Sequence, residues 1–252
     1  MTDRAGDVQE LARAIVLGDI DRLRELLDRD PTLALEQLPG NPRSMLHLAN
    51  DWPGHRPNIA EMIRALVAAG ADPNAPMPHP DNPNVAETPL HWAASNGDVA
   101  AVETLLDVGA EIDAPGGIFD GCTAYEEAVI FEKYEAAQLL HERGAADYLP
   151  GVAALGRDDE IAGYFDAHGN LRTDVGTLPH WTERPSSKMI VDRAFQFACR
   201  AGHLAIAQDL HARGGDLADV NPAGRTALQE AQHNGHVAVV EWLQSLDDAT
   251  NR

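Results

Sequence analysis

The stretch TPLHWAASNGDVAAVETLLDVGAEIDA, Thr88–Ala114, decides the fold of this chain. It holds two segments rich in apolar residues, with a short polar turn at Asn96 and Gly97 between them and a second glycine, Gly109, after them. Glycine reaches positive φ without a steric cost and therefore commonly ends helices. The stretch predicts a helix, a turn, a second helix and a glycine stop. One such pair cannot bury its own apolar face, so it must stack on similar units.

The same unit recurs along the chain. Boxes related to LHWAASNGD at residue 90 are LHLAN at 46, FQFACRAGH at 195 and LQEAQHNGH at 228. The second residue of a box and the next glycine stop lie 18 residues apart in His91–Gly109, Glu126–Gly144, Gly151–Gly169 and Gln196–Gly214. A fixed spacing of this kind indicates a stacked array of helical repeats.

Thr88–Ala114 resembles the repeat of the ankyrin family almost throughout its length. The resemblance implies an all-α ankyrin-repeat solenoid of about seven helix-turn-helix repeats, with the first helices on a concave face and short hairpin or loop fingers between repeats. We expect one domain over residues 1–252, with repeats at 6–39, 41–75, 86–118, 119–147, 148–176, 185–220 and 222–250.

Three insertions interrupt the period. His47 and Gly70 lie 23 residues apart, which places five extra residues in DWPGHRPN after Asn50. Further length falls in the proline-rich stretch 75–87 and in 170–188. DWPGHRPN also resembles a segment of a group of bacterial ankyrin-repeat proteins, a likeness that supplies no function. Loops tolerate insertion cheaply, but an insertion between the helices of one repeat points toward the concave side, so DWPGHRP favours a functional role.

Composition limits the partners of the chain. A formal charge of -21 disfavours nucleic acid and anionic membranes and favours neutral or basic partners. The sequence has no long apolar run and no signal peptide, so we expect a cytoplasmic monomer. The 17 arginines against two lysines indicate a bacterial source. Cys122 and Cys199 are too few for a disulfide framework and are expected to be reduced.

Aromatic residues of the first helices predict a binding surface. A discontinuous stripe would be formed by Trp52, Trp92, Phe131 and Phe197. Its apolar area would supply affinity and a few neighbouring polar groups would orient the bound molecule, so it would suit a peptide or compact ligand. The alternative is that these rings only pack between repeats. The predicted ligand-binding residues are Trp52, His55, Trp92, Asn96, Glu127, Phe131, Phe197 and Arg200.

The sequence also allows an acid-base site. Asp51 precedes His55 by four residues, and Glu127 could face the same hollow, so these three are the candidate catalytic residues. Asp51 could equally cap its own turn. His47 and His91 are expected to be structural. No metal or other cofactor is expected, because the remaining histidines lack ligand spacing and no nucleotide-binding glycine motif is present.

Two functions follow from these residues. The first is a binding module that holds a peptide or ligand in an aromatic-lined groove, partly closed by DWPGHRP and by residues 170–188. The second is a small-molecule enzyme of the isomerase, cyclase or lyase type that uses Asp51, His55 and Glu127. A regulatory scaffold without a ligand of its own is a third possibility.

Overall fold

The computed structural model describes residues 4–250 except 39, 41, 80, 179 and 182. The boundary residues 39 and 41 of the first two predicted repeats therefore lie outside the described residues, as do single positions within the stretches 75–87 and 170–188. The described residues fall into two compact units, Met1–Ala145 and Ala146–Arg252. Among the described helices, none is long and apolar enough to cross a membrane.

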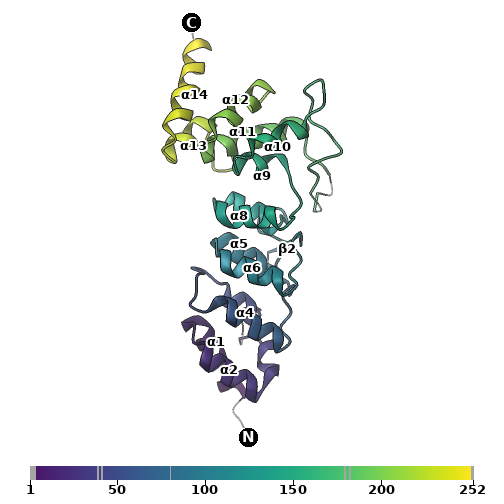
Figure 1. Ribbon diagram of the computed structural model, residues 1–252, viewed down its shortest axis with the longest axis vertical. Coiled ribbons are helices and arrows are strands. Elements are labelled where there is room, and N and C mark those ends of the chain that lie inside the picture. Colours follow the sequence, from purple (N-terminus) through teal and green to yellow (C-terminus); the bar gives the residue numbers. More distant parts are fainter. Residues whose placement is uncertain are drawn as a thin grey trace. The chain divides into compact units, whose positions relative to one another are not determined.

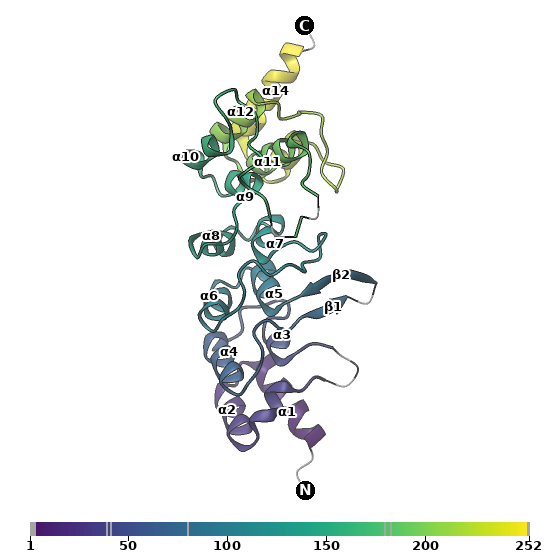
Figure 2. The ribbon, with the colours of Figure 1, turned by 90° about the vertical axis from the view of Figure 1, so that its right-hand side faces the viewer.

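Unit 1 consists of four helix pairs (Figures 1 and 2). The first helix of a pair packs against the second, and each pair contacts the next, as the repeat pattern predicts. The pairs are α1 (Arg4–Leu17) with α2 (Ile20–Arg29), α3 (Met45–Ala49) with α4 (Ile59–Ala68), α5 (Pro89–Asn96) with α6 (Val99–Asp107), and α7 (Ala124–Ile130) with α8 (Tyr134–Glu142). A short 3-10 helix, η1 (Pro31–Leu35), follows α2.

Unit 2 consists of three further pairs around its own core. The pairs are α9 (Leu149–Ala154) with α10 (Asp158–Ile161), α11 (Ser187–Ala201) with α12 (Leu204–Ala212), and α13 (Ala227–His233) with α14 (Val237–Thr250). The 3-10 helix η2 (Ala162–Tyr164) follows α10. The described residues thus form seven helix pairs, four in unit 1 and three in unit 2.

Side-chain caps and glycines set the helix boundaries. Thr123 starts α7 with a capping box, because its hydroxyl accepts from the Glu126 N–H while the Glu126 carboxylate accepts from the Thr123 N–H. Gly97 and Gly202 adopt left-handed conformations, with φ of +73° and +85°, in the turns that follow α5 and α11. The local sequence therefore specifies both the start of a helix and the turn into its partner.

The glycine stops match the prediction with one exception. Gly70, Gly109, Gly144 and Gly214 have φ between +92° and +104° directly after their helices. Gly169 does not end a helix, so this assignment was wrong. The second helix of the fifth repeat is only Asp158–Ile161 and η2 follows it, whereas Gly169 lies in a tight turn closed by the Asp166 side chain, which accepts from the Asn170 N–H at 2.9 Å.

The finger at 75–87 contains a small antiparallel hairpin of β1 (Met77–His79) and β2 (Asn82–Glu87) (Figure 2). Met77 pairs with Glu87 and Pro78 with Ala86. The next finger, residues 115–121, lies against it, because the Ala86 N–H donates to the Gly116 carbonyl at 2.9 Å. The fingers 75–87 and 115–121 are thus joined by a backbone hydrogen bond.

The stretch 170–188 packs onto the core of unit 2. Leu178 is buried, and Val175 and Trp181 cover the core cluster that includes Phe165 and Phe195. Arg184 holds the loop by donating to the carbonyls of Arg172 and Thr173, at 2.8 and 2.6 Å. The described part of this insertion is therefore a packed loop.

Candidate protein-interaction surface

Residues 50–58, called the DWPGH loop below, connect α3 to α4 (Figure 2). They carry the exposed Trp52. Arg56 organises the interior of the loop. Its guanidinium donates to the carbonyls of Ala49 and Val16, each at 3.1 Å, and to that of Asp51 at 3.4 Å. One arginine side chain thereby satisfies carbonyl groups at the ends of α1 and α3 and in the loop itself.

A second set of contacts joins the loop to the turn between α1 and α2. Asn58 adopts a left-handed conformation, with φ of +59°, and its side-chain amide donates to the Gly18 carbonyl at 3.0 Å. A Cβ atom at Gly18 would lie 2.8 Å from the Pro57 carbonyl oxygen, so only glycine permits this approach.

The opposite side of the loop is fixed to the third helix pair. The His55 N–H donates to Asp98 Oδ2 at 2.6 Å, while Asp98 Oδ1 accepts from the Ala101 N–H and caps α6. The Asn96 amide donates to the Asn50 carbonyl at 2.8 Å. The DWPGH loop is therefore bonded to the helix pairs on both sides of its own.

Trp52 lies at the tip of this fixed loop with 80% of its surface exposed. Its N–H donates to Asp51 Oδ1 at 2.9 Å, and the Trp52–Pro53 peptide bond is cis. A large apolar ring that stays exposed to water contributes little to the stability of the fold, because apolar side chains stabilise a fold through burial. Exposed tryptophan on a rigid segment is typical of an interface centre.

Trp92, half-buried on α5, is fixed on several sides. The His47 ring meets it edge-on at 5.2 Å between centroids, and the Arg43 guanidinium lies 5.0 Å from its centre. Its side chain also hydrogen-bonds to the Glu87 carboxylate. Trp92 thus packs between neighbouring repeats, the alternative that the sequence left open for these rings.

The three candidate catalytic residues differ in their partners and in their exposure. His55 was the predicted partner of Asp51. The Asp51 carboxylate instead forms an ion pair with Arg43 at 2.5 Å. His55 is exposed and adopts a left-handed conformation, with φ of +53°, and its backbone N–H binds Asp98. Glu127 is fully buried and accepts from the Ile118 N–H at 2.8 Å. An exposed imidazole and a fully buried carboxyl do not face one hollow, because solvent reaches only the first.

Phe197 is also placed differently from the prediction. It is 6% exposed, and the guanidinium groups of Arg193 and Arg200 lie 5.7 and 4.5 Å from its ring centre. Its ring and Arg200 therefore stack on each other within unit 2. Phe131, by contrast, is 38% exposed at the end of α7. The predicted surface stripe thus includes one residue that belongs to a core.

Buried histidines link successive repeats, as expected. His91 Nε2 bonds to the Cys122 carbonyl at 3.0 Å, and its Nδ1 accepts from the Thr88 N–H at 3.1 Å, which fixes the tautomer with the proton on Nε2. His47 makes the corresponding bond to the Glu87 carbonyl at 3.0 Å. Burial lowers the pKa of both rings to about 4. They are structural groups, neutral at physiological pH.

The acidic residues beneath the finger 115–121 have raised pKa values. Burial, followed by the charge of Glu87, raises the pKa of Glu127 to about 8. Burial also raises the pKa of Glu126 to about 7, against hydrogen bonds from Thr123 that lower it. Cys122 lies in the same region, and Cys199 in the core of unit 2; both thiols are free, and burial raises the pKa of each. These thiols are inert because the reactive thiolate is disfavoured.

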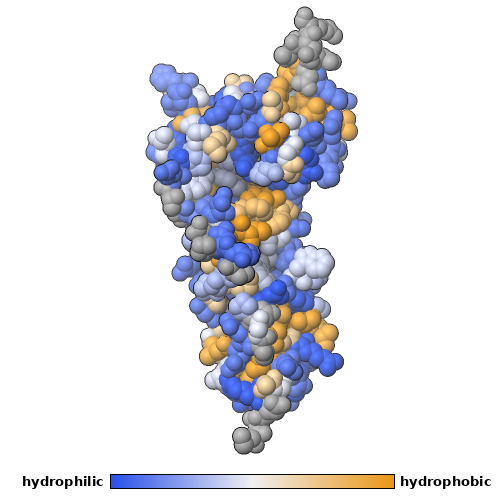
Figure 3. Space-filling model, turned by 180° about the vertical axis from the view of Figure 1, so that it is seen from behind, coloured by the Kyte–Doolittle hydropathy of each residue, from blue (hydrophilic) through white to orange (hydrophobic). Residues whose placement is uncertain are grey.

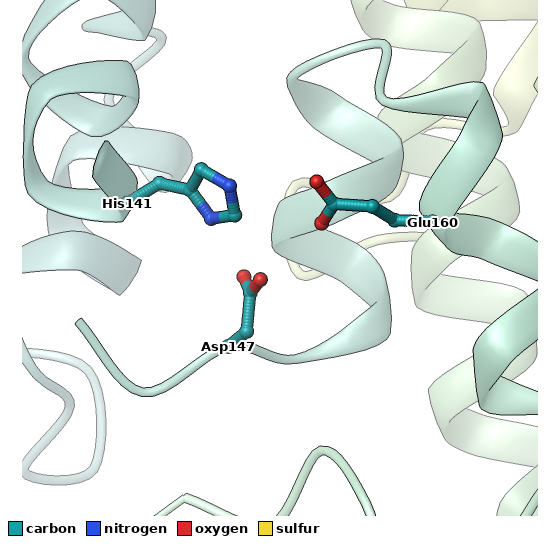
Figure 4. Close-up of side chains that lie close together, drawn as sticks. All are labelled: His141, Asp147 and Glu160. Atoms are coloured by element: carbon teal, nitrogen blue, oxygen red, sulfur yellow. The ribbon is translucent and has the colours of Figure 1, made fainter. Parts of the chain in front are cut away.

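Unit 2 contains a further pair of carboxylates. Figure 4 shows Asp147, before α9, and Glu160, on α10, pointing toward the same region. Burial, reinforced by these two charges, raises the pKa of Tyr164. The Glu160 carboxylate also accepts from Arg157 Nε at 2.6 Å. His141, also labelled there, belongs to α8 of unit 1, where its ring lies 6.4 Å from that of Tyr125.

Some residues of the surface were not predicted from the sequence. Arg56 and Asp98 hold the DWPGH loop through backbone groups, and such bonds leave no spacing pattern in a sequence. The sequence offered one indication of how the loop is held, which is the arginine inside the insertion, Arg56. Ile118 and Phe119, exposed at 40% and 41%, lie on the finger 115–121, whereas the predicted stripe was drawn from the first helices.

Comparisons with known proteins agree with this architecture. A family model described as ankyrin repeats in three copies matches residues 58–149, and one described as ankyrin repeats in many copies matches residues 192–244. The crystal structure of the human ASB11 ankyrin repeat domain superposes with a TM-score of 0.52 at 22% identity, over 92% of this chain and 96% of that one. This structural likeness concerns the fold alone.

Two curated proteins share part of the sequence. The rice (Oryza sativa subsp. japonica) E3 ubiquitin-protein ligase XB3 is 34% identical over 109 residues, which are 43% of this chain and 22% of that protein. The human B-cell lymphoma 3 protein is 36% identical over 89 residues, 34% of this chain and 18% of that protein. The chain thus spans about a fifth of the length of these relatives. With both family models together matching more than half of its residues, the chain belongs to the ankyrin-repeat family, whose repeats imply a protein-interaction module.

Proposed function

We propose that this chain binds a protein partner through a surface centred on Trp52 of the DWPGH loop. The observation that carries the proposal is the exposure of this ring on a loop bonded to both neighbouring helix pairs. A rigid aromatic side chain loses little conformational entropy on binding, and tryptophan is enriched among residues that dominate interface energy.

Apolar neighbours extend this surface. Val16 and Leu17, at the end of α1, are 46% and 61% exposed, and the Val16 carbonyl accepts from Arg56 of the loop. Asp51, which accepts from the Trp52 backbone N–H and pairs with Arg43, provides polar groups in the same loop. An apolar centre with a polar rim suits a peptide segment or the surface of a folded protein.

Binding explains the geometry better than the enzymatic alternative. An acid-base site would require Asp51 to orient His55, and Asp51 is paired with Arg43. The ubiquitin-protein ligase activity in the name of the rice relative does not transfer, because this chain matches only 22% of that protein. The protein acts as a monomeric binding module in this proposal, and its solution state can be measured by sedimentation equilibrium.

The test compares Trp52→Ala with Leu35→Ala, a control that truncates another exposed apolar residue of unit 1. Proteins captured from the host lysate by the native chain and by each variant are quantified by mass spectrometry, and the enriched protein is purified for calorimetric titration. Trp52→Ala should weaken binding by about thirtyfold, equivalent to the loss of roughly 2 kcal/mol. Leu35→Ala should bind as the native chain does. Native affinity in Trp52→Ala, with its fold intact by circular dichroism, would refute the proposal.

A further inference from the structure

Three apolar side chains form a second exposed surface on unit 1, called the acidic aromatic patch below. They are Ile118 and Phe119 of the finger 115–121 and Phe131 at the end of α7, exposed at 40%, 41% and 38%. The rings of Phe119 and Phe131 are tilted against each other with centroids 5.5 Å apart. Figure 3 shows one face of the molecule, on which apolar residues gather into separate orange patches among hydrophilic ones.

The finger that carries the patch is firmly held. Gly116 accepts from the Ala86 N–H through its carbonyl at 2.9 Å, and the Gly117 N–H donates to the Cys122 carbonyl at 2.8 Å. The Ile118 N–H donates to the buried Glu127 carboxyl at 2.8 Å. These bonds set the positions of Ile118 and Phe119 before any partner arrives, which reduces the ordering cost of binding.

Negative charge surrounds the patch. Besides the buried Glu126 and Glu127, residues 110–135 contain five acidic residues and one lysine: Glu111, Asp113, Asp120, Glu132, Glu135 and Lys133. Asp120 directly follows Phe119 and Glu132 directly follows Phe131, and both are exposed. Each adopts a left-handed conformation, with φ of +55° and +59°. A phosphate-rich partner would be repelled here, whereas a cationic one is favoured.

We propose that the acidic aromatic patch binds a basic peptide segment in which an apolar side chain is flanked by arginines. The apolar side chain would pack between Ile118, Phe119 and Phe131. Arginine suits the rim because its guanidinium stacks on aromatic faces and pairs with carboxylates. This surface differs from the one centred on Trp52, so either proposal can be refuted without refuting the other.

The probe is a fluorescein-labelled peptide with two central leucines flanked by two arginines on each side. Two further peptides replace the arginines by glutamate or the leucines by alanine. Fluorescence anisotropy at about 50 mM NaCl, where charges are weakly screened, should detect binding of the first peptide and weaker or no binding of the other two. Phe119→Ala should weaken the first peptide by about tenfold or more. Trp52→Ala should leave this binding unchanged.

Two matched variants separate the patch from general acidity. Asp120→Asn with Glu132→Gln should weaken binding and reduce its salt dependence, whereas Asp21→Asn with Asp28→Asn, at exposed positions of α2, should not. Met189→Ala is the control for loss of an exposed apolar side chain. Equal weakening by the two charge variants, or native affinity in Phe119→Ala, would overturn the proposal. Circular dichroism melting of each variant excludes loss of fold as the cause.

Discussion

Gly116 shows how one residue sets the distance between two fingers. Its φ is +133°, and a Cβ atom there would lie 2.5 Å from the Ala86 carbonyl oxygen. Gly109 has a φ of +100°, but an added Cβ would meet nothing within 4 Å. The two glycines therefore distinguish backbone strain from steric exclusion.

Gly109→Ala and Gly116→Ala should both destabilise the protein, and Gly116→Ala should have the larger effect. The left-handed conformation costs alanine about 1–2 kcal/mol at either position. The clash with Ala86 adds roughly 1–3 kcal/mol at Gly116, because backbone must move to relieve it. Urea unfolding measures both differences. Equal losses would show that the finger 115–121 shifts freely away from β2.

Glu127 predicts a pH dependence of stability. Its pKa is raised to about 8 in the folded chain from an ordinary value of 4.5, so between these values the folded state binds more protons than the unfolded state. Stability from this group is therefore complete below pH 4.5 and declines as the pH rises through about 8. Glu126 acts in the same direction with a pKa of about 7.

Glu127→Gln should make this decline shallower. The amide retains an acceptor for the Ile118 N–H but does not ionise, and Glu126 remains. Melting temperatures are best compared from about pH 7.5 to about 9, because His47 and His91, with ordinary pKa values of 6.5, are largely uncharged there in both the folded and the unfolded state. Glu135→Gln, on the exposed side of α8, is the control and should follow the native curve. An unchanged slope in Glu127→Gln would contradict the assignment.

At the scale of elements, helix α6 and the DWPGH loop share one side chain. Asp98 caps α6 through Oδ1 and accepts from the His55 N–H through Oδ2. Asp19 provides the corresponding cap for α2, accepting from the Arg22 N–H. Asp98 therefore has a loop contact in addition to the role that both residues share.

Asp98→Ala should cost more stability than Asp19→Ala. Loss of the cap alone costs about 1 kcal/mol in each case. Leaving the His55 N–H without its acceptor adds about 1–3 kcal/mol at Asp98. Chemical denaturation gives both values, and partner affinity in Asp98→Ala should fall as the Trp52 position loosens. Similar costs in the two variants would mean that water replaces Asp98 at His55.

The sequence predicted the helix pairs well, because box and glycine spacing reflect local backbone requirements. It failed at Gly169, where a glycine at the expected distance closes an Asp166 turn instead of a helix. It also failed for Phe197, because stacking by Arg193 and Arg200 depends on side-chain geometry. The DWPGH loop could be located from the extra length, but its bonds to Asp98 and Val16 could not, since they join residues about 40 positions apart.

For the whole molecule, the charge of -21 dominates the solution behaviour. Repulsion among like charges destabilises a compact state. Salt at 0.1 M largely screens the repulsion between exposed charges that lie more than about 10 Å apart. The melting temperature should therefore rise between about 20 mM and about 200 mM NaCl, before salt-specific effects dominate. Surface ion pairs such as Arg4–Asp30 act in the opposite sense but contribute little each. A melting temperature that falls with salt would show that these pairs outweigh the net repulsion.

The bonds of the DWPGH loop should also affect how the first three helix pairs of unit 1 unfold. In a repeat array each unit contacts only its neighbours, so terminal units can fray one at a time. Here Arg56 and Asn58 bind the first helix pair while His55 and Asn50 bind the third. The first three pairs should therefore open together, and amide hydrogens of α1, α3 and α5 should exchange with one common protection factor under native conditions. The loop that presents Trp52 thereby converts three stacked repeats into a single cooperative folding unit.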